Sequence, residues 1–339
     1  MKAIILEKVG EIDYREVVPS DVHMTTEEEN IEHGTKMLSL SVDREPNDDE
    51  IAVEAVLGAI CTHEVSLYKG DLTHPVYPMI PGHEAVHRVL KVGKNVKHLK
   101  AGDYCACCWY MGQWSRRLVG PAQYAFKLPD DIGDPANWVI EPAASIVNAV
   151  SYMYLKPADR VLLVGAGFMG LLMVQLIKGY PFAEFVVCDI KESSRELASK
   201  CGAKTVLKPE EVEGRFDKVI ECTGSQGGLD LAVSHSAKAG VIYLFGWHRQ
   251  PRTVDFKNEH LLGTVMVNTS PAIDEGREYS RYWPKTIKLF ENGVFDLSLL
   301  ISHKYKAEDI KTAFVDSVKR EEGFVKSVIY FENADKYIK

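Results

Sequence analysis

The sequence has no run of the roughly 20 apolar residues that an α-helix needs to cross a bilayer. Its first residues, MKAIILEKVGEIDY, hold no long apolar stretch followed by a small-residue cleavage site, so no secretory signal is indicated. These absences argue against a membrane or secreted protein. We therefore expect a cytoplasmic location and no membrane partner.

Positive charge and paired cysteines are also scarce. The net charge is −8, and no basic stripe is visible, which argues against a nucleic-acid-binding protein. The seven cysteines are odd in number and scattered, unlike a disulfide framework. What remains is an ordinary globular composition, 46% hydrophobic and 26% charged, so the chain can bury a core.

The chain has 339 residues, enough for two domains of ordinary size. Over residues 1–149, short strand-like runs between Gly, Pro and Asp predict a mostly antiparallel β domain, with the acidic stretch Ser20–Met37 as an inserted loop or hairpin. Over 150–288, strands alternate with helices, one of them expected within Gly227–Gly240, which predicts a doubly wound parallel sheet. We expect the β-like pieces in 289–339 to complete the first domain. The predicted fold class is α/β.

A glycine-rich turn marks a candidate dinucleotide site in the second region. Three glycines form G-x-G-x-x-G between an apolar strand, Val161–Val164, and an apolar helix, Leu171–Ile177. The first glycine permits the tight turn, the second lets the backbone approach a pyrophosphate, and the third allows close helix–strand packing. The helix N-terminus then offers N–H groups to the phosphate. The residues expected to bind the cofactor here are Gly165, Gly167, Phe168, Met169 and Gly170.

The end of the next strand carries an acidic residue, Asp189. A carboxylate there accepts hydrogen bonds from the hydroxyls of the adenosine ribose and repels a 2′-phosphate, which favours NAD over NADP. Lys191, two residues on, softens that preference. The alternative is a glycine turn of another βαβ unit, with Asp189 as a helix N-cap.

Three residues of metal-ligand type stand in irregular settings of the first region. Cys61 ends the apolar run VEAVLGAI, and His83 follows a Pro-Gly pair. Glu141 precedes a proline, which breaks regular structure. A thiolate, an imidazole and a carboxylate suit zinc, and a catalytic zinc site leaves a fourth position for water or substrate. The alternative is that Gly-His-Glu is an ordinary polar turn.

Six short motifs follow one another in the order found in one family. The sequence resembles the zinc-dependent medium-chain dehydrogenase/reductase superfamily, and its Glu-Pro segment resembles the polyol and threonine dehydrogenase branch. The resemblance covers nearly the whole chain except about residues 20–45. The motifs are Cys61-Thr62-His63-Glu64, Pro81-Gly82-His83-Glu84, Val92-Gly93-Lys94-Asn95-Val96, Gly102-Asp103, Glu141-Pro142 and the turn Gly165–Gly170.

The resemblance implies a GroES-like catalytic domain, a Rossmann cofactor domain and one catalytic zinc per chain. It implies that Cys61, His83 and Glu141 are the zinc ligands. It places Glu84 near the metal, as an exchanging ligand or a catalytic residue. It also implies that Glu64 orients the metal-binding histidine.

Relatives often carry Ser or Thr two residues after the cysteine ligand, as the first step of a proton relay. This sequence has His63 there. Imidazole accepts a proton near neutral pH, so His63 is either the base or a pocket residue that binds substrate. The proton path is expected to run through His63, Thr62 or Ser66. His87 replaces a glycine that is usual in relatives.

The four cysteines that hold a structural zinc in many relatives are incomplete here. Only Cys105, Cys107 and Cys108 follow the Gly-Asp pair, and their spacing does not match a tetrahedral loop site. The structural-zinc lobe is therefore expected to be missing. We expect these cysteines to be core or pocket residues, with Cys107, Cys108 and Trp109 nearest the substrate.

The resemblance implies a zinc-dependent NAD(H) oxidoreductase that interconverts a secondary alcohol and a ketone, with a polyol, cyclitol or sugar derivative as substrate. The nicotinamide half of NAD is expected to contact Thr223, Gly246 and Trp247. Arg252 is expected either to attract a phosphate or carboxylate of the substrate or to lie in a subunit contact. Two alternatives are a zinc-free enone or quinone reductase of the same superfamily and a non-catalytic NAD-binding sensor or scaffold. A homodimer is expected, with a tetramer as the alternative.

Metal analysis of the pure protein tests this hypothesis. We expect about one zinc per chain, because three protein ligands are typical of a catalytic zinc. The variant Cys61→Ser is expected to lose bound metal and activity and to keep its fold, as measured by metal content, turnover and circular dichroism. Full activity in this variant would exclude the site.

Overall fold

The structure is a computed structural model, and it divides by internal contacts into two compact units. The first unit comprises Met1–Pro142, Glu275–Glu291 and Leu300–Lys339, and the second comprises Ala143–Asp274 and Asn292–Leu299. The expected ranges 1–149, 150–288 and 289–339, which follow from the pattern of strands and helices in the sequence, stay a prediction. The structure describes residues 1–22, 40–42, 44–72, 76–109, 111–269 and 279–338.

The expected loop over Ser20–Met37 lies outside the described residues from residue 23 onward. Its first residues belong to a short 3₁₀ turn, Pro19–Asp21.

The first unit is a β structure with nine described strands. They are β1 (Lys2–Lys8), β2 (Glu11–Glu16), β3 (Glu50–Ala59), β4 (Ala85–Val92), β5 (Tyr104–Cys107), β6 (Leu118–Pro121), β7 (Ala125–Lys127), β14 (Ile301–Lys306) and β15 (Lys326–Tyr330). Strands β1 and β2 form a hairpin, and the main sheet has the order β14-β15-β3-β4-β5-β7, with β6 paired to β3.

Within the main sheet, β14 and β15 run parallel, and the other pairings are antiparallel. The mostly antiparallel domain is therefore confirmed, and the late strands join it through β15 and β3. Strand β3 is buried along almost its whole length because it lies in the interior of the sheet, which suits its run of Val, Ala, Ile and Leu.

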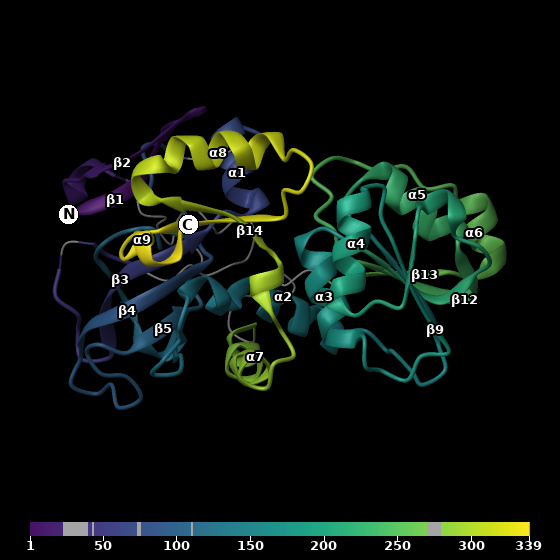
Figure 1. The fold of residues 1–339 in the computed structure, drawn as a ribbon, viewed down its shortest axis with the longest axis horizontal. Helices are drawn as coiled ribbons and strands as arrows, with labels where there is room; N and C mark the ends of the chain where they lie inside the picture. Colours follow the sequence, from purple (N-terminus) through teal and green to yellow (C-terminus); the bar gives the residue numbers. More distant parts are fainter. Residues whose placement is uncertain (23–39, 43, 73–75, 110, 270–278, 339) are drawn as a thin grey trace. The chain divides into compact units, whose positions relative to one another are not determined.

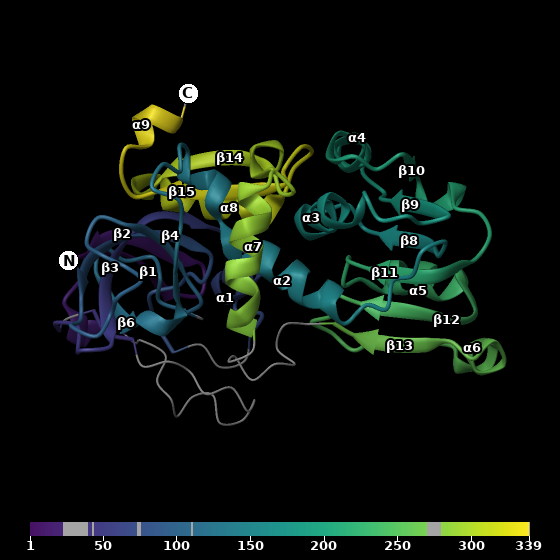
Figure 2. The same ribbon diagram turned by 90° about the horizontal axis from the view of Figure 1, so that it is seen from below.

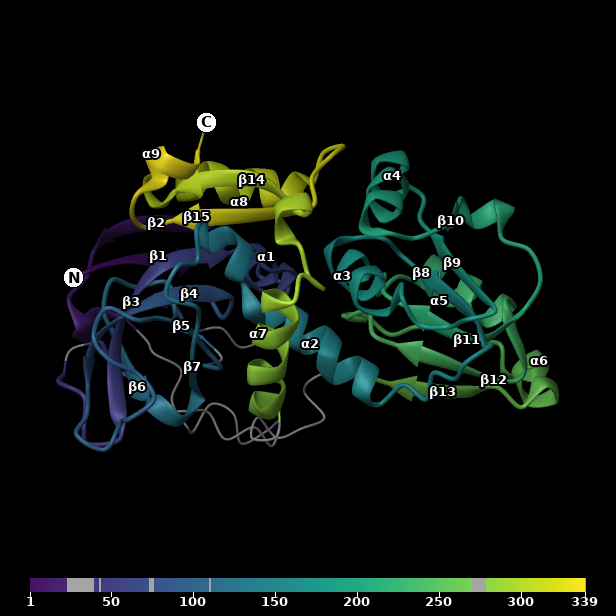
Figure 3. The same ribbon diagram turned by 60° about the horizontal axis from the view of Figure 1, so that its bottom comes forward.

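Nine helices are described. They are α1 (Thr62–Lys69), α2 (Ile140–Ser151), α3 (Phe168–Ile177), α4 (Glu192–Cys201), α5 (Gln226–Ser234), α6 (Phe256–Leu262), α7 (Tyr282–Glu291), α8 (Ile310–Lys319) and α9 (Ala334–Tyr337). Helix α8 lies beside β15 (Figures 1 and 3) and buries Phe314 against Ile329 and the β1 residues Ile4 and Leu6. Among the described residues, no helix has the length and apolarity needed to span a bilayer.

The second unit is a six-stranded sheet in which every pairing is parallel. Its strands are β8 (Arg160–Val164), β9 (Glu184–Cys188), β10 (Thr205–Leu207), β11 (Phe216–Glu221), β12 (Ser236–Leu244) and β13 (Val265–Asn268). They follow one another as β10-β9-β8-β11-β12-β13 (Figure 2). The chain starts in the middle, winds outward to one edge and then to the other, which is the doubly wound topology predicted from the sequence.

The expected helix over Gly227–Gly240 is only partly correct. Helix α5 ends at Ser234, and β12 already begins at Ser236. Ser236 pairs with Phe216, and the register then shifts so that Val241 pairs with Lys218, with Ala239 in the left-handed region at φ 57°. The alanines of this stretch look helical in sequence, but pairing with β11 draws them into an irregular strand.

A glycine at the metal-site turn is sterically required. Gly82 has φ +99°, and a Cβ there would lie 2.3 Å from Cδ1 of the buried Trp114. We expect Gly82→Ala to lower the free energy of unfolding by roughly 2–5 kcal/mol, from left-handed strain and overpacking together.

Gly102→Ala is the matched control, because Gly102 has φ +92° and no atom within 4 Å of its Cβ position. It is expected to cost only about 1–2 kcal/mol from the backbone strain. Urea unfolding followed by tryptophan fluorescence measures both variants, and equal losses would show that contact with Trp114 contributes nothing.

Candidate metal centre and cofactor site

Three turns of the first unit carry the candidate metal ligands. Cys61 lies between β3 and α1, and His83 and Glu84 directly precede β4. Glu141 lies in the first turn of α2. Two groups of ligand atoms lie within 4.8 Å of one another, Cys61 with Glu64 and His83, and His83 with Glu84 and Glu141. The four expected ligands therefore gather around one histidine, although their binding of a metal stays a prediction.

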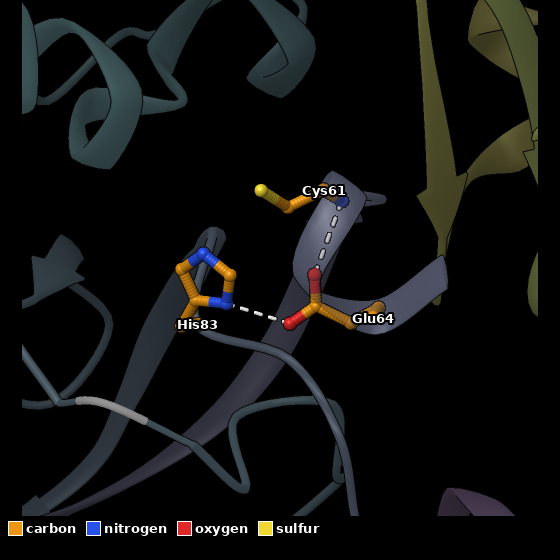
Figure 4. Close-up of side chains that lie close together, drawn as sticks. All are labelled: Cys61, Glu64 and His83. Carbon is orange, nitrogen blue, oxygen red and sulfur yellow. Dashed lines mark hydrogen bonds and ion pairs between the residues drawn. The ribbon is translucent and has the colours of Figure 1, made fainter. Parts of the chain in front are cut away.

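Glu64 fixes the orientation of this histidine (Figure 4). Its Oε1 lies 2.6 Å from Nδ1 of His83, and its Oε2 accepts a hydrogen bond of 3.1 Å from the backbone N–H of Cys61. A carboxylate at Nδ1 assigns the ring proton to Nδ1, which puts the lone pair of the ring on Nε2, the atom that would bind a metal. The contact supports the orienting role that the resemblance implied for Glu64.

The electrostatics of Glu64 agree with this arrangement. Burial raises the pKa of the Glu64 carboxyl, but His83 and His63 outweigh it and hold the pKa far below its usual range. Glu64 is therefore a carboxylate at neutral pH and a strong hydrogen-bond acceptor, although it is 1% exposed.

Glu84 is held by a buried lysine that the sequence analysis missed. Nζ of Lys326 in β15 lies 2.6 Å from Oε2 of Glu84, and Oε1 of Glu84 lies 4.0 Å from Nε2 of His83. Burial lowers the pKa of Lys326, but the effects of Glu84 and Cys61 outweigh burial and raise the pKa above its ordinary value. The ammonium group therefore stays charged. One sequence signal was available, because a lysine in a fully buried strand needs a charged partner.

The donor set fits a divalent cation. Burial and Glu84 raise the pKa of the Cys61 thiol, so a thiolate there requires a nearby cation. Cys61, Glu84 and Glu141 would together bring three negative charges, of which Lys326 offsets one. A zinc ion would offset the other two and prefers such sulfur, nitrogen and oxygen donors.

The expected proton-relay residues take different positions. The His63 ring lies edge-on to the His83 ring with 5.6 Å between centroids, and His63 Nδ1 lies 4.0 Å from Oε1 of Glu64. Thr62 Oγ1 accepts a hydrogen bond from Arg320. Ser66 is buried and donates its hydroxyl proton to the Thr62 carbonyl within α1, and its expected relay role stays a prediction.

Two residues expected nearest the substrate lie in the core instead. Cys107 and Trp109 are 1% exposed and belong to the apolar cluster around Ile51 and Leu118. Alternation along β5 turns Cys107 to the same side as Cys105, with 3.8 Å between the sulfurs. Cys108, on the other side, is the cysteine whose thiol pKa is raised by burial and by Glu141.

The glycine-rich turn of the second unit has the geometry that a pyrophosphate requires. Gly165 has φ +99°, and a Cβ on Gly170 would lie 2.0 Å from the Gly165 carbonyl oxygen, so both positions need glycine. Gly167 caps α3, and no atom lies within 4 Å of its Cβ position, which leaves room for a ligand. Phe168 and Met169 begin the helix.

Asp189 lies beside this turn at the end of β9. Its Oδ2 accepts a hydrogen bond of 2.7 Å from Ala166 N–H, and its Oδ1 accepts one of 2.8 Å from Lys191 N–H. The sequence analysis missed Arg195, whose guanidinium donates to the carbonyls of Asp189 and Ile190. Asp189 thus braces the turn and stays a predicted ribose ligand.

The carboxyl ends of β11 and β12 carry the remaining expected cofactor residues. Thr223 packs against the glycine-rich turn, since a Cβ on Gly165 would lie 2.7 Å from Thr223 Cγ2. A Cβ on Gly246 would lie 2.2 Å from Gly224 N, and Trp247 is 48% exposed. The Arg252 guanidinium contacts His248 and the Gly224 carbonyl within the second unit, and its expected substrate or subunit contact stays a prediction.

The two units match known families. Residues 47–147 match the family described as alcohol dehydrogenase GroES-like domain, and residues 168–291 match zinc-binding dehydrogenase. The chain is 24% identical to D-xylulose reductase of Morganella morganii, covering 93% of this chain and 96% of that protein. It is 27% identical to L-threonine 3-dehydrogenase of Shewanella sp. (strain ANA-3), covering 80% and 89%.

The fold is also that of known dehydrogenase structures. L-idonate 5-dehydrogenase from Escherichia coli superimposes with a TM-score of 0.79 at 16% identity, over 97% of this chain and 98% of that one. A GroES-like domain and a Rossmann fold of the NAD(P)-binding type define a zinc-type dehydrogenase. The chain belongs to the medium-chain dehydrogenase superfamily.

His87, which replaces a usual glycine, lies in the core and gives a pH-dependent stability. It is fully buried, with Nε2 3.3 Å from the Gln113 carbonyl, and burial lowers its pKa from 6.5 to about 4. The unfolded chain therefore binds a proton near pH 6.5 that the folded chain binds only near pH 4. The stability that neutral His87 contributes is therefore expected to be fully present above pH 6.5 and to be lost as the pH falls toward 4. Between pH 7 and pH 5 the free energy of unfolding is expected to fall by about 2 kcal/mol.

We expect His87→Gln to remove this part of the pH dependence, because glutamine does not titrate. His260→Gln, at an exposed histidine of α6, is the control and is expected to keep it. Urea unfolding at pH 5 and pH 7 measures the difference, and the same pH dependence in His87→Gln and wild type would contradict the assignment.

Proposed function

We propose that this protein is a zinc-dependent NAD(H) dehydrogenase that interconverts a secondary alcohol and its ketone, with a polyol, cyclitol or sugar derivative as substrate. The observation that carries the proposal is the gathering of Cys61, Glu84 and Glu141 around His83 in the first unit. The relative named D-xylulose reductase supports a sugar-derived substrate, and the one named L-threonine 3-dehydrogenase supports a secondary alcohol more generally.

The chemistry divides between the bound groups and the side chains. When bound, zinc would act as a Lewis acid toward the substrate oxygen, and NAD would accept or return the hydride. Cys61, His83 and Glu141 would hold the metal, and Glu84 would lie beside it. Glu64 holds the ring proton of His83 on Nδ1, so that the lone pair lies on Nε2.

The proton that leaves the alcohol needs an acceptor near the metal. His63 is suited to it, because it lies beside His83 and an imidazole accepts protons near neutral pH. Thr62, next to it, accepts a hydrogen bond from Arg320 at Oγ1 and keeps its own hydroxyl proton as a donor.

The cofactor preference is proposed from Asp189. A carboxylate at the end of β9 favours the two free ribose hydroxyls of NAD. Lys191 and Arg195 lie next to it and would reduce the penalty for a 2′-phosphate. We therefore infer NAD as the preferred cofactor, with measurable use of NADP.

Turnover with a panel of polyols, aminocyclitols and sugar alcohols tests the proposal. We expect NAD reduction with at least one of them, lost on chelation and restored by added zinc, and a higher kcat/KM with NAD than with NADP. Activity on enones or quinones that survives complete metal removal would favour the zinc-free reductase. NAD binding without any turnover would favour the sensor or scaffold.

A further inference from the structure

A closed ring of hydrogen bonds joins two loops of the second unit. Gly224 N–H donates to Oε1 of Glu221 at 3.0 Å, and the Gly224 carbonyl accepts from Nη2 of Arg252 at 2.6 Å. Nε of Arg252 donates to Nδ1 of His248 at 3.3 Å, and Nε2 of His248 lies 2.9 Å from Oε2 of Glu221. The ring links the turn after β11 to the loop after β12.

The charges and protons of this ring agree with one another. Because Nδ1 of His248 accepts a hydrogen bond from Arg252, the imidazole proton of His248 belongs on Nε2, which donates it to Glu221. The Glu221 side chain is fully buried, and its Oε2 meets His248 while its Oε1 accepts from Gly224 N–H. Loss of His248 would remove the donor at Oε2, whereas loss of Arg252 would release the Gly224 carbonyl and Nδ1 of His248.

The ring also fixes the segments beside it. Glu221 accepts further hydrogen bonds from the backbone N–H and the hydroxyl of Thr223, and its carbonyl accepts from Phe245 and Gly246 N–H. Thr223 in turn packs against Gly165 of the glycine-rich turn. Residues 222–225 and 245–247 are therefore held as one surface next to the pyrophosphate turn.

The strand order says which half of a dinucleotide meets this surface. The pyrophosphate turn follows β8, and the predicted ribose ligand Asp189 follows β9, on one side of β8. Strands β11 and β12 lie on the other side. A dinucleotide with its adenosine over β9 must extend its nicotinamide half toward the carboxyl ends of β11 and β12.

We propose that Glu221, His248 and Arg252 are positioning residues that preorganise the surface for the nicotinamide half of the cofactor. The inference rests on the proposed NAD(H) function. It assigns a task to His248 and Arg252 other than binding substrate. The hydrogen-bonded ring fixes residues that follow β11 and β12 and none that follow β9. It is therefore expected to affect the binding of the nicotinamide half of the cofactor and to leave the binding of the adenosine half unchanged.

Two ligands separate the halves, NADH and ADP-ribose, which lacks the nicotinamide. We expect Arg252→Lys to weaken NADH binding about tenfold, since a single ammonium cannot bridge His248 and Gly224 as a guanidinium does. ADP-ribose affinity is expected to change less than about twofold. Fluorescence titration measures the first and calorimetry the second.

The matched control is Arg160→Lys at the opposite, amino edge of the same sheet. Arg160 also bridges two groups, in its case the carboxylate of Glu184 and the carbonyl of Arg215. It is expected to leave both affinities unchanged. The double variant His248→Ala/Arg252→Lys is expected to bind NADH no more weakly than the weaker single variant, because the ring opens only once.

The outcomes separate the two proposals. If the wild-type protein binds NADH no more tightly than ADP-ribose, the ring's role is overturned. If the wild-type protein binds neither ligand, both the proposed cofactor and the ring's role are overturned. Unchanged NADH affinity in Arg252→Lys would overturn only the ring's role. Parallel losses for NADH and ADP-ribose would do the same, because they would show a general support of the second unit.

Discussion

The hydrogen bond between the Glu64 carboxylate and Nδ1 of His83 is the contact on which the chemistry of the first unit depends. It joins the turn after β3 to the turn before β4, and the second oxygen of Glu64 fixes the backbone at Cys61. With the ring proton on Nδ1, the lone pair of His83 lies on Nε2, the atom predicted to bind a metal. The desolvation cost of burying the Glu64 carboxylate is offset by hydrogen bonds to both of its oxygens. The candidate site is therefore organised by a residue outside the set of predicted metal ligands.

Most of the fold and the outline of the site followed from sequence because their signals are local. The glycine spacing at Gly165–Gly170, the apolar strands and the Pro-Gly turn before His83 each constrain a few neighbouring residues. The structure shows why a glycine is needed at Gly170, because a Cβ there would lie 2.0 Å from the Gly165 carbonyl oxygen. The order of the motifs along the chain then indicated the family, which the matches to both units confirm.

The errors and omissions arose where contacts with distant segments determine the environment of a residue. Lys326 was missed because its partner Glu84 lies far away in the sequence, and only the pairing of β15 with β3 brings them together. Trp109 was assigned to the pocket because an aromatic after cysteines suits both a pocket and a core, and the chain alone does not show which face is covered. The sequence of Ser236–Gly240 resembled that of a helix, but in the structure this segment belongs to β12, which pairs with β11.

The bond between Lys326 and Glu84 also determines when the site can exist during synthesis. Cys61 and His83 are synthesised well before β15, which lies between β14 and β3 in the sheet. Until β15 pairs with it, β3 is open along Leu57–Ala59 and the Glu84 carboxylate lacks its counter-ion. A nascent chain that has not yet made β15 therefore carries the candidate ligands without the strand and the ammonium group that complete their surroundings.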